Sequence, residues 1–373
     1  MCLKILSLYR KILPKSISTQ SITILIATVD HISRCKGVSA SPRRHPNPRS
    51  WAPQTSPFII AHRLTNDKKS LRIAIASHVV LDQIKTSDDR VLESIGGPPS
   101  YGGITSRRFG FDVFLVTKAG NDLPVDLYAI LHNNNILLRD STQVNSPTTR
   151  FLIISRGDSR DLLLTNKCRP LTVDDIRKTK VDAWLASPVI DEIPKDVLAE
   201  IKQNRGRKDF VMLDPQGYLR LADYQGHIIM RDKLELDLLG IDAIKVDNQE
   251  MAALTAGLQG LAGMKVLQDR GIKFVIHTEP GIIHLLHKNM HYWLSLQAID
   301  AVDSTGVGDI LCASFSCSYL KEKDPVWAIC FGVGAVKAAL ETGQVGVAKI
   351  PSMSKIEENA SYLYNAIGFQ SLS

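Results

Sequence analysis

The sequence predicts an α/β fold: a doubly wound, mostly parallel sheet with helices on both faces and a small β lid. The first observation is that strand and helix signals alternate along the chain. Short apolar runs, typical of buried parallel strands, occur at 71–77, 111–117, 183–187, 210–214 and 243–246. The second observation is that polar residues or glycines follow several of these runs, where open α/β sheets bind ligands. The third is a pair of alternating hairpin patterns, which predict the lid.

The first strand and its neighbour are predicted at 71–77 and 111–117. Asp82 follows the first strand, and the turn Gly96-Gly97 then precedes a helix. A glycine turn allows a ligand to approach the backbone closely. The second strand ends in the run Lys118-Ala119-Gly120-Asn121-Asp122. Taken alone, Asp82 is also typical of an ordinary turn residue.

Two hairpin patterns, at 83–95 and 150–166, predict a small sheet above the ligand-binding edge. We place the lid segments at about 82–96 and 148–167. Ordinary surface hairpins are the alternative interpretation.

Asp247 and Glu250 follow the strand predicted at 243–246 and open a helix. Their spacing is that of a capping box, in which each residue satisfies a backbone N–H of the other. Later strands are predicted at 272–277, 282–286 and 291–296, the last two as a hairpin.

The stretch 303–309, Asp-Ser-Thr-Gly-Val-Gly-Asp, lies between a predicted strand end and a helix that begins near Ile310. A glycine turn at a helix start lets backbone N–H groups converge on an anion, and the helix dipole adds about half a positive charge. Asp309 would be costly beside a bound phosphate unless it accepts the proton of an attacking hydroxyl. The alternative is that Asp309 only caps the helix. The β-branched Val307 would be strained if the turn needs a positive φ there.

This stretch resembles the Asp-Thr-x-Gly-Ala-Gly-Asp signature of the PfkB (ribokinase-like) carbohydrate and nucleoside kinases. Asp82, Gly96, Gly97, Gly120 and Asp122 also fall in register with the opening segments of that family. The resemblance covers roughly residues 71–367. It implies a ribokinase-like fold, ATP and Mg²⁺ as cofactors, and a small hydroxyl-bearing acceptor.

The resemblance also implies a role for each matching residue. Asp309 is the catalytic base, in a turn formed by Gly306, Val307 and Gly308. The implied acceptor-binding residues are Asp82, Gly96, Gly97, Tyr101 and Asp309. The implied ATP-binding residues are Asp247, Thr278, Gly281, Thr305, Gly306 and Gly308. Glu250 is implied to contact the metal through water. This role suits Mg²⁺, which keeps several waters and takes few protein ligands, and it can coexist with the capping box.

The chain departs from the family pattern at several positions. Tyr101 stands where the family often has Asn, and a phenol cannot make the paired contacts of an amide, which argues against a ribose- or fructose-type pocket. Asp247 replaces the Asn of Asn-x-x-Glu. Of the Thr-x-Gly-x-x-Gly segment beside the nucleotide, only the last glycine, Gly281, is retained.

The charge of the chain is unevenly distributed. The formal net charge is +7, but residues 1–66 hold ten lysine and arginine residues and a single acid, Asp30, whereas 67–373 holds slightly more acids than bases. We therefore expect a basic extension at 1–66, either transit-like, disordered or due to a start codon placed too early, and a kinase domain at 67–373. The apolar run 22–29 is far shorter than the ~20 residues of a membrane span. Neither nucleic acid nor a membrane is an expected partner.

Cysteines and histidines give no clear metal pattern. The six cysteines form no Cys-x-x-Cys pair, which favours buried reduced thiols and a cytoplasmic location. His277, His284 and His287 are not at the spacing of metal ligands along the chain, so we expect solvated or hydrogen-bonded side chains.

The predicted reaction is transfer of the γ-phosphoryl group of ATP to a hydroxyl of a small sugar, an inositol-like polyol or a nucleoside. A homodimer through the lid is expected. Two other classes are weighed. A non-catalytic nucleotide-binding relative would not need a base such as Asp309. A dinucleotide-dependent oxidoreductase would need Gly-x-Gly-x-x-Gly after the first strand, and no such run follows Ser77.

Overall fold

A nine-stranded sheet lies at the centre of the computed structural model, with the strand order β17-β16-β15-β14-β13-β10-β9-β1-β4. The structure describes residues 70–85, 91–139, 142–156, 159–204, 210–299 and 301–372. The extension expected at 1–66 therefore lies outside the described residues. Within these ranges the described residues belong to one compact unit, Lys68–Ser373.

The sheet is mostly parallel, as the alternating pattern predicts. Its parallel strands are β1 (Arg72–Ala76), β4 (Asp112–Val116), β9 (Ala183–Ala186), β10 (Phe210–Leu213), β13 (Ala243–Val246) and β14 (Phe274–Glu279). Three antiparallel strands extend one edge: β15 (Ile282–His287), β16 (Met290–Ser295) and β17 (Gly368–Ser371). The central strands are almost entirely apolar because helices cover both of their faces, and the buried Lys245 in β13 is an exception.

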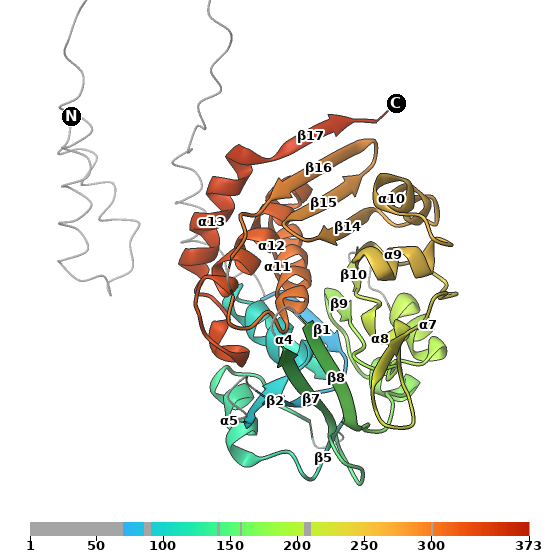
Figure 1. Cartoon of the computed structure of the whole chain (residues 1–373), viewed down its shortest axis with the longest axis vertical. Helices are drawn as coiled ribbons and strands as arrows, with labels where there is room; N and C mark the ends of the chain where they lie inside the picture. The colour runs from blue at the N-terminus through green and yellow to red at the C-terminus, as the bar shows by residue number, and fades with distance from the viewer. Residues whose placement is uncertain are drawn as a thin grey trace, which may run out of the picture. The chain divides into compact units, whose positions relative to one another are not determined.

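Helices pack on both faces of the sheet (Figure 1). One face carries α4 (Pro98–Arg108), α11 (Val307–Glu322), α12 (Pro325–Leu340) and α13 (Met353–Ala366). The other carries α6 (Val173–Arg177), α7 (Lys195–Gln203), α9 (Asn248–Leu254) and α10 (Gly260–Asp269). Alternate residues of β1 enter the two cores: Ile73 and Ile75 belong to the first, Ala74 and Ala76 to the second. The doubly wound prediction is thus confirmed.

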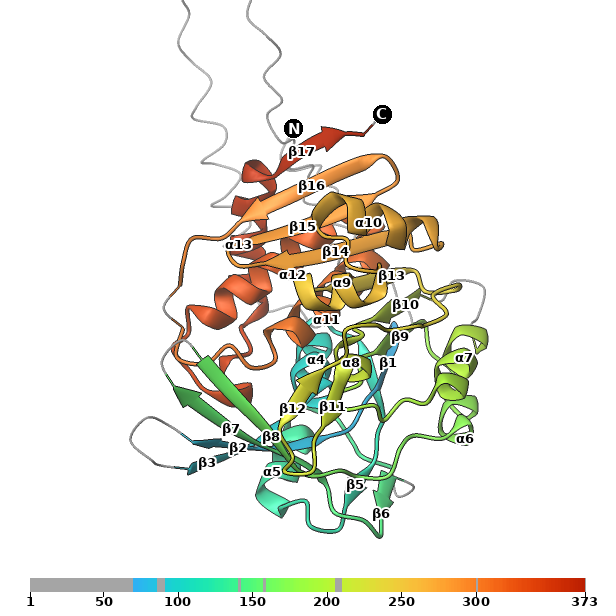
Figure 2. The same ribbon diagram turned by 45° about the vertical axis from the view of Figure 1, so that its right-hand side comes forward.

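A separate four-stranded sheet forms the predicted lid, with the order β3-β2-β7-β8 (Figure 2). Its strands are β2 (Val80–Lys85), β3 (Val91–Gly96), β7 (Thr149–Arg156) and β8 (Ser159–Asn166). A bridge between Leu163 and His227 joins the lid to the small pair β11 (Arg220–Ala222) and β12 (Ile228–Met230). Shorter elements are β5 (Ala119–Gly120), β6 (Gln143–Val144), α5 (Val125–Asn133), α8 (Gln216–Leu219) and a 3-10 turn at Gly346–Lys349.

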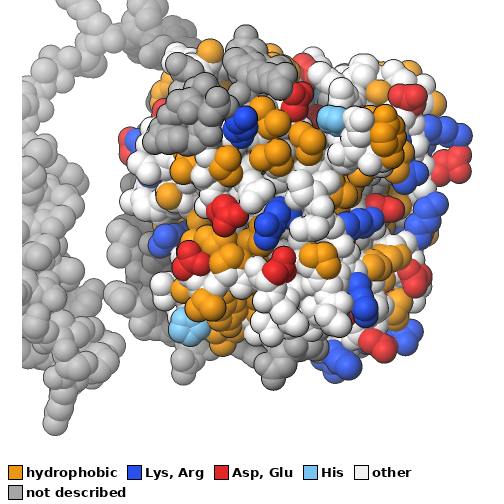
Figure 3. Space-filling model, turned by 60° about the horizontal axis from the view of Figure 1, so that its bottom comes forward, with side chains coloured by type: hydrophobic (Ala, Val, Ile, Leu, Met, Phe, Trp, Pro, Cys, Tyr) orange, Lys and Arg blue, Asp and Glu red, His pale blue; other side chains and the backbone are white. Residues whose placement is uncertain are grey.

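The surface and the cysteines follow ordinary patterns. On the face that Figure 3 shows, acidic and basic side chains are interspersed among hydrophobic ones, and neither sign of charge predominates. None of the described helices combines the length and the apolar character that crossing a membrane requires. Cys168, Cys312, Cys317 and Cys330 are buried free thiols, as predicted, whereas Cys2 and Cys35 lie outside the described residues.

Candidate active site

The glycine turn at 303–309 is a sharp bend that starts α11. Gly306 is the N-cap of this helix and has a left-handed backbone, with φ of 75°. The ring of Tyr101 packs directly on it, because a methyl group at Gly306 would lie 2.3 Å from the ring carbons. The left-handed residue is therefore the glycine, and Val307, which starts the helix, is not among the described residues with a positive φ. The strain considered for Val307 does not arise.

Asp303 holds this turn in place. Its Oδ1 accepts the backbone N–H of Thr305 at 2.7 Å, and its Oδ2 accepts that of Gly346 at 2.8 Å. The ammonium of Lys349, which is fully buried, lies 2.7 Å from Asp303 Oδ2. Burial acts to raise the pKa of Asp303, but these hydrogen bonds outweigh it and hold the pKa below its usual value. The turn is thus fixed before any ligand binds.

Asp309 lies in the first turn of α11, and its side chain is only 5% exposed. Its hydrogen bond among the described residues comes from the hydroxyl of Ser187, with Oγ 3.4 Å from Oδ1. Asp324 at the start of α12 is different, since its carboxylate caps that helix by accepting two backbone N–H groups. Asp309 therefore does not have the geometry of a helix cap.

The environment of Asp309 makes it a stronger base than an exposed aspartate. Burial raises the pKa of its carboxyl to about 8, and the carboxylate of Asp214 acts in the same direction. Lys245, Arg220 and the Ser187 hydroxyl act against this rise. A pKa close to neutral pH is the range in which a carboxylate can accept and later release a proton efficiently.

Asp309 faces a cavity of about 530 Å³ between the lid and the edge of the main sheet. Apolar lid side chains and polar groups from the strand ends form its walls. The lining includes Val80, Asp82, Gly97, Tyr101, Phe151, Ile153, Leu162, Asp214, Arg220, Lys245, Asp247, Glu250, Ser304, Thr305, Gly306, Gly308 and Asp309. Most of the site residues predicted from the sequence are therefore brought together here.

Asp82 and the Gly96-Gly97 turn form one end of this cavity. Asp82 is buried, and a methyl group at Gly96 would lie 1.9 Å from its Oδ2. Gly96 itself is not among the lining residues of the cavity, and its missing side chain makes room for the Asp82 carboxylate. Gly97 has φ of 75° and is the N-cap of α4. A side chain there would meet the carbonyl oxygen of His78 at 2.8 Å.

The other end of the cavity is rich in buried charge. Asp247 and Glu250 form the predicted capping box: Asp247 Oδ1 accepts the N–H of Glu250 at 2.8 Å, and Glu250 Oε2 accepts that of Asp247 at 2.8 Å. Burial raises the pKa of Glu250 to about 7, although Lys245 opposes the rise. Carboxylate oxygens that line this end are suitable ligands for Mg²⁺ or for its bound waters.

Sequence reasoning missed Lys245, Asp214 and Ser187. The ammonium of Lys245 lies 3.3 Å from Asp214 and 3.2 Å from Glu250, and all three side chains are buried. Burial alone would lower the pKa of Lys245, but these carboxylates hold it well above its usual value. A lysine inside the apolar strand run 243–246 was the available signal, because a buried lysine needs a partner.

Besides Gly96, three predicted residues are not among those that line the cavity. Thr278 and Gly281 lie at and beyond the end of β14, and Val307 starts α11. The prediction of hydrogen-bonded histidines is confirmed, since His277, His284 and His287 each make a hydrogen bond. His277 and His284, together with Glu279, are close enough to hold a metal ion, because β14 and β15 pair antiparallel and place the two histidines opposite each other.

Known proteins with similar sequences are few and distant. No family model matches the chain. The bifunctional protein HldE of Marinomonas sp. (strain MWYL1) is 26% identical over 254 residues, which cover 65% of this chain and 51% of HldE. A fructokinase of Klebsiella pneumoniae is 22% identical over 260 residues, which cover 65% of this chain and 82% of the fructokinase. The chain thus spans about half the length of HldE.

Matches to solved structures cover more of this chain than the matches to known sequences do. A pyrophosphate-dependent kinase in the ribokinase family superposes with a TM-score of 0.66 at 22% identity, over 77% of this chain and 99% of that chain. Ribokinase from Thermotoga maritima gives a TM-score of 0.61 at 19% identity, over 78% of this chain and 99% of the ribokinase chain. The chain has the ribokinase fold. Fructokinase from Vibrio cholerae O395, with fructose, ADP and a calcium ion bound, gives a TM-score of 0.62 at 16% identity, over 78% of this chain and 99% of the fructokinase chain.

The ribokinase fold confirms the resemblance to the PfkB kinases that the motif at 303–309 indicates. It also accounts for the position of the cavity. In this fold the glycine turn, the strand ends and the lid meet at the carboxyl edge of the parallel sheet, where α/β proteins bind ligands.

Proposed function

We propose that this protein is a kinase that transfers the γ-phosphoryl group of ATP to a hydroxyl of a small sugar, an inositol-like polyol or a nucleoside. The observation that carries the proposal is the buried carboxylate of Asp309, which faces a cavity of about 530 Å³ beside a glycine turn. Similar structures include a ribokinase-family kinase complexed with myo-inositol and a ribokinase complexed with ribose and ATP. These ligands support the inositol-like and sugar classes of acceptor, whereas the nucleoside class rests on the resemblance of the motif at 303–309.

Asp309 takes the proton of the acceptor hydroxyl as that oxygen forms its bond to the γ-phosphorus. The bond from the γ-phosphorus to the bridging oxygen of ADP breaks in the same transfer. Backbone N–H groups of Gly306 to Gly308, at the start of α11, stabilise the charge on the transferred group, whereas the N–H of Thr305 is already held by Asp303. The raised pKa of Asp309 supports its role as the proton acceptor.

Asp82 and Gly97 orient the acceptor, because a carboxylate can accept hydrogen bonds from several hydroxyl groups. The buried ring of Tyr101 closes this end of the cavity. Phe151 and Ile153 add apolar lid surface over the same space. The resulting pocket suits a compact polyol better than a long substrate.

The donor end of the cavity fits the phosphates with their magnesium ion. Asp247 and Glu250 line it, and Glu250 already contacts Lys245, which favours contact with the metal through water rather than directly. Mg²⁺ would neutralise phosphate charge during the transfer. Thr278 and Gly281 are proposed to contact the nucleoside part of ATP, outside the space that the cavity encloses.

A homodimer through the lid is part of the proposal. The strand β3 forms one edge of the lid sheet, and its residues Val91 and Leu92 are exposed. An exposed apolar edge strand is a surface that a second copy can cover. Sedimentation of the parent and of a Leu92→Glu variant tests this; the variant should sediment as a monomer.

The deciding experiment is a phosphate-donor consumption screen over inositols, pentoses, hexoses and nucleosides. ATP is the main donor, and pyrophosphate is a second arm because one similar structure is a pyrophosphate-dependent kinase. Asp309→Asn should lower kcat by at least 10²-fold while keeping donor binding. Asp324→Asn is the matched control, because it changes a helix-capping aspartate in the same way. Equal turnover in the parent and in Asp309→Asn would refute the mechanism.

A non-catalytic nucleotide-binding relative is the alternative function. It predicts ATP binding in calorimetry with no consumption of either donor for any acceptor. The buried base argues against it, since burying a carboxylate without a chemical use costs stability.

A further inference from the structure

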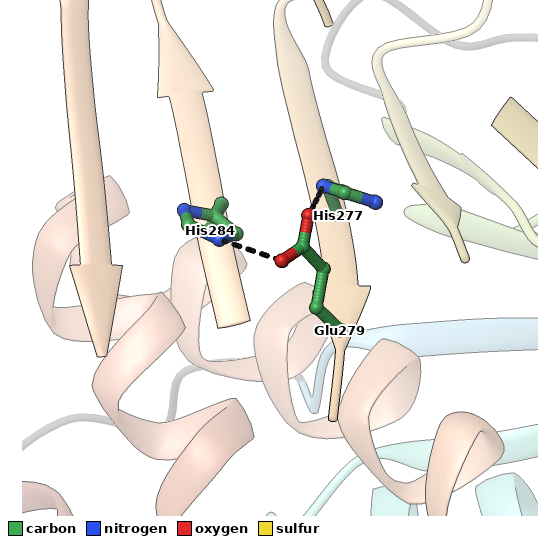
Figure 4. Close-up of side chains that lie close together, drawn as sticks. All are labelled: His277, Glu279 and His284. Atoms are coloured by element: carbon green, nitrogen blue, oxygen red, sulfur yellow. Dashed lines mark ion pairs between the residues drawn. The ribbon is translucent and has the colours of Figure 1, made fainter. Parts of the chain in front are cut away.

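A second cluster of polar side chains lies on the sheet beside the cavity, on β14 and β15. His277 and His284 face each other across these antiparallel strands, and Glu279 follows two residues along β14 on the same face as His277. Figure 4 shows the Glu279 carboxylate between the two imidazole rings. None of the three residues is among those that line the cavity. The cluster therefore lies outside the cavity, beside Thr278 and Gly281, which are proposed to contact the nucleoside part of ATP.

The distances in this cluster suit a tetrahedral metal ion. Nδ1 of His277 lies 3.4 Å from Glu279 Oε1, and Nε2 of His284 lies 4.0 Å from Glu279 Oε2. All three ligand atoms lie within 4.8 Å of one another. Ligand atoms that are about 2.0–2.2 Å from a tetrahedral zinc ion lie roughly 3.3–3.5 Å apart. Small side-chain rotations would bring the three atoms to that separation.

The nitrogen of His277 that faces Glu279 has no hydrogen-bond partner among the described residues. The other ring nitrogen, Nε2, lies 2.8 Å from Asn248 Oδ1 and donates its hydrogen there. Because Nε2 carries the hydrogen, Nδ1 of the neutral ring carries a lone pair. A lone pair and a carboxylate oxygen thus face each other, and a cation between them would satisfy both.

The second ring nitrogen of His284, Nδ1, also has a hydrogen-bond partner, which fixes the orientation of the ring. Its Nδ1 lies 3.1 Å from Nε2 of His291 on β16, and the two rings are stacked with centroids 5.2 Å apart. In the tautomer that binds metal, His284 Nδ1–H donates to His291. His291 Nδ1 then turns its hydrogen to the exposed amide of Gln370, 3.2 Å away, which can present its oxygen by rotation. Metal-binding histidines commonly have such an acceptor on the second ring nitrogen.

We propose that His277, Glu279 and His284 bind a transition-metal dication such as Zn²⁺, with a water molecule as the fourth ligand. Two imidazoles and one carboxylate favour zinc over Mg²⁺ or Ca²⁺, which prefer oxygen ligands. The metal would fix the turn after β14 against Asn248, the first residue of α9. This site does not depend on the proposed kinase activity.

The test is metal binding by the full chain after treatment with a chelator. Calorimetry with Zn²⁺ should give one site per chain, and Co²⁺ should give the absorption of a tetrahedral complex. His284→Gln should weaken Zn²⁺ binding by at least 100-fold, and Asn248→Ala by about 10-fold, the usual effect of removing a partner of a ligand. His287→Gln should leave binding unchanged. His287 is on the same strand but stacks on Phe274, with ring centroids 4.5 Å apart.

Thermal unfolding provides a second readout that needs no substrate. Zn²⁺ should raise the Tm of the parent and of His287→Gln, because a ligand that binds only the folded state stabilises it. It should not raise the Tm of His284→Gln. Equal Zn²⁺ affinity in the parent and in His284→Gln would overturn the proposal. A loss of Zn²⁺ affinity in His287→Gln as large as that in His284→Gln would also overturn it.

Discussion

Substituting Gly306 by alanine tests how rigidly the glycine turn is built. Gly306 has φ of +75°, and an added methyl group would lie 2.3 Å from Cγ and Cδ2 of Tyr101. The ring cannot easily move away, because it is only 1% exposed and the ammonium of Lys349 lies over it at 5.6 Å. The substitution therefore strains the backbone and overpacks the core at the same time.

Each effect has a known size. A residue other than glycine in the left-handed region costs about 1–2 kcal/mol. Forcing an extra methyl group into a packed core costs about 1–3 kcal/mol. The free energy of unfolding of Gly306→Ala should therefore fall by about 2–5 kcal/mol. Gly343→Ala is the matched control, since Gly343 has φ of +64° but nothing within 4 Å of the added methyl group. Gly343→Ala should therefore show only the backbone effect, a fall of about 1–2 kcal/mol in the free energy of unfolding.

Urea unfolding followed by tryptophan fluorescence measures both variants. The midpoint should fall further for Gly306→Ala than for Gly343→Ala, with the slope m unchanged. Turnover should also drop in Gly306→Ala, because the backbone N–H groups of the turn would move. Equal destabilisation of the two variants would show that Tyr101 does not pack on the turn as described.

Two further predictions concern the buried charges. Lys245→Met should lower the free energy of unfolding by about 3–5 kcal/mol, because it leaves Asp214 and Glu250 buried without their ammonium partner. The control is Lys337→Met, which breaks the half-exposed ion pair with Glu341 on one helix. It should lower the free energy of unfolding by less than about 1 kcal/mol in the same denaturant titration. The kcat/KM of the proposed kinase should rise with pH up to about 8, where Asp309 ionises. The same carboxyl is protonated more readily in the folded than in the unfolded protein. Its contribution to stability should therefore fall from about pH 4 to about pH 8, and melting curves of Asp309→Asn should lack this decline.

The parts of the site that neighbouring residues determine could be predicted from the sequence. The capping box of Asp247 and Glu250 needs only local backbone geometry. The turn that presents Asp309 could be predicted from its glycines, although Gly346 and Lys349 hold it from a distant part of the sequence. Alternating apolar runs were sufficient to predict the doubly wound sheet, since helices that cover both faces leave continuous apolar strands.

The parts that depend on strand order could not be predicted in the same way. Ser187, Asp214 and Lys245 lie at or near the carboxyl ends of β9, β10 and β13, which are far apart in the sequence but adjacent in the sheet. Their contacts with one another and with Asp309 therefore appear only after the sheet is assembled.

The histidine cluster also depends on strand pairing. The predicted hairpin at 282–296 corresponds to the pair β15 and β16, whereas His277 lies opposite His284 because β14 pairs with β15, a pairing that was not predicted. Comparing their separation along the chain with metal-ligand spacings ignored this pairing. For residues on paired strands, the hairpin register decides which side chains meet.

Burial of Asp309 serves the proposed chemistry in two ways. It raises the pKa of the carboxyl toward neutral pH, which an exposed aspartate would not reach, and it removes the water that would compete for the hydroxyl proton. The neighbouring charges determine how far the pKa of Asp309 rises. Asp214 adds to the rise, whereas Lys245 and Arg220 oppose it, so that the carboxylate can still ionise close to pH 8. An aspartate that merely capped a helix would need neither the cavity nor these partners, and Asp324 at the start of α12 has the capping bonds that Asp309 does not make among the described residues.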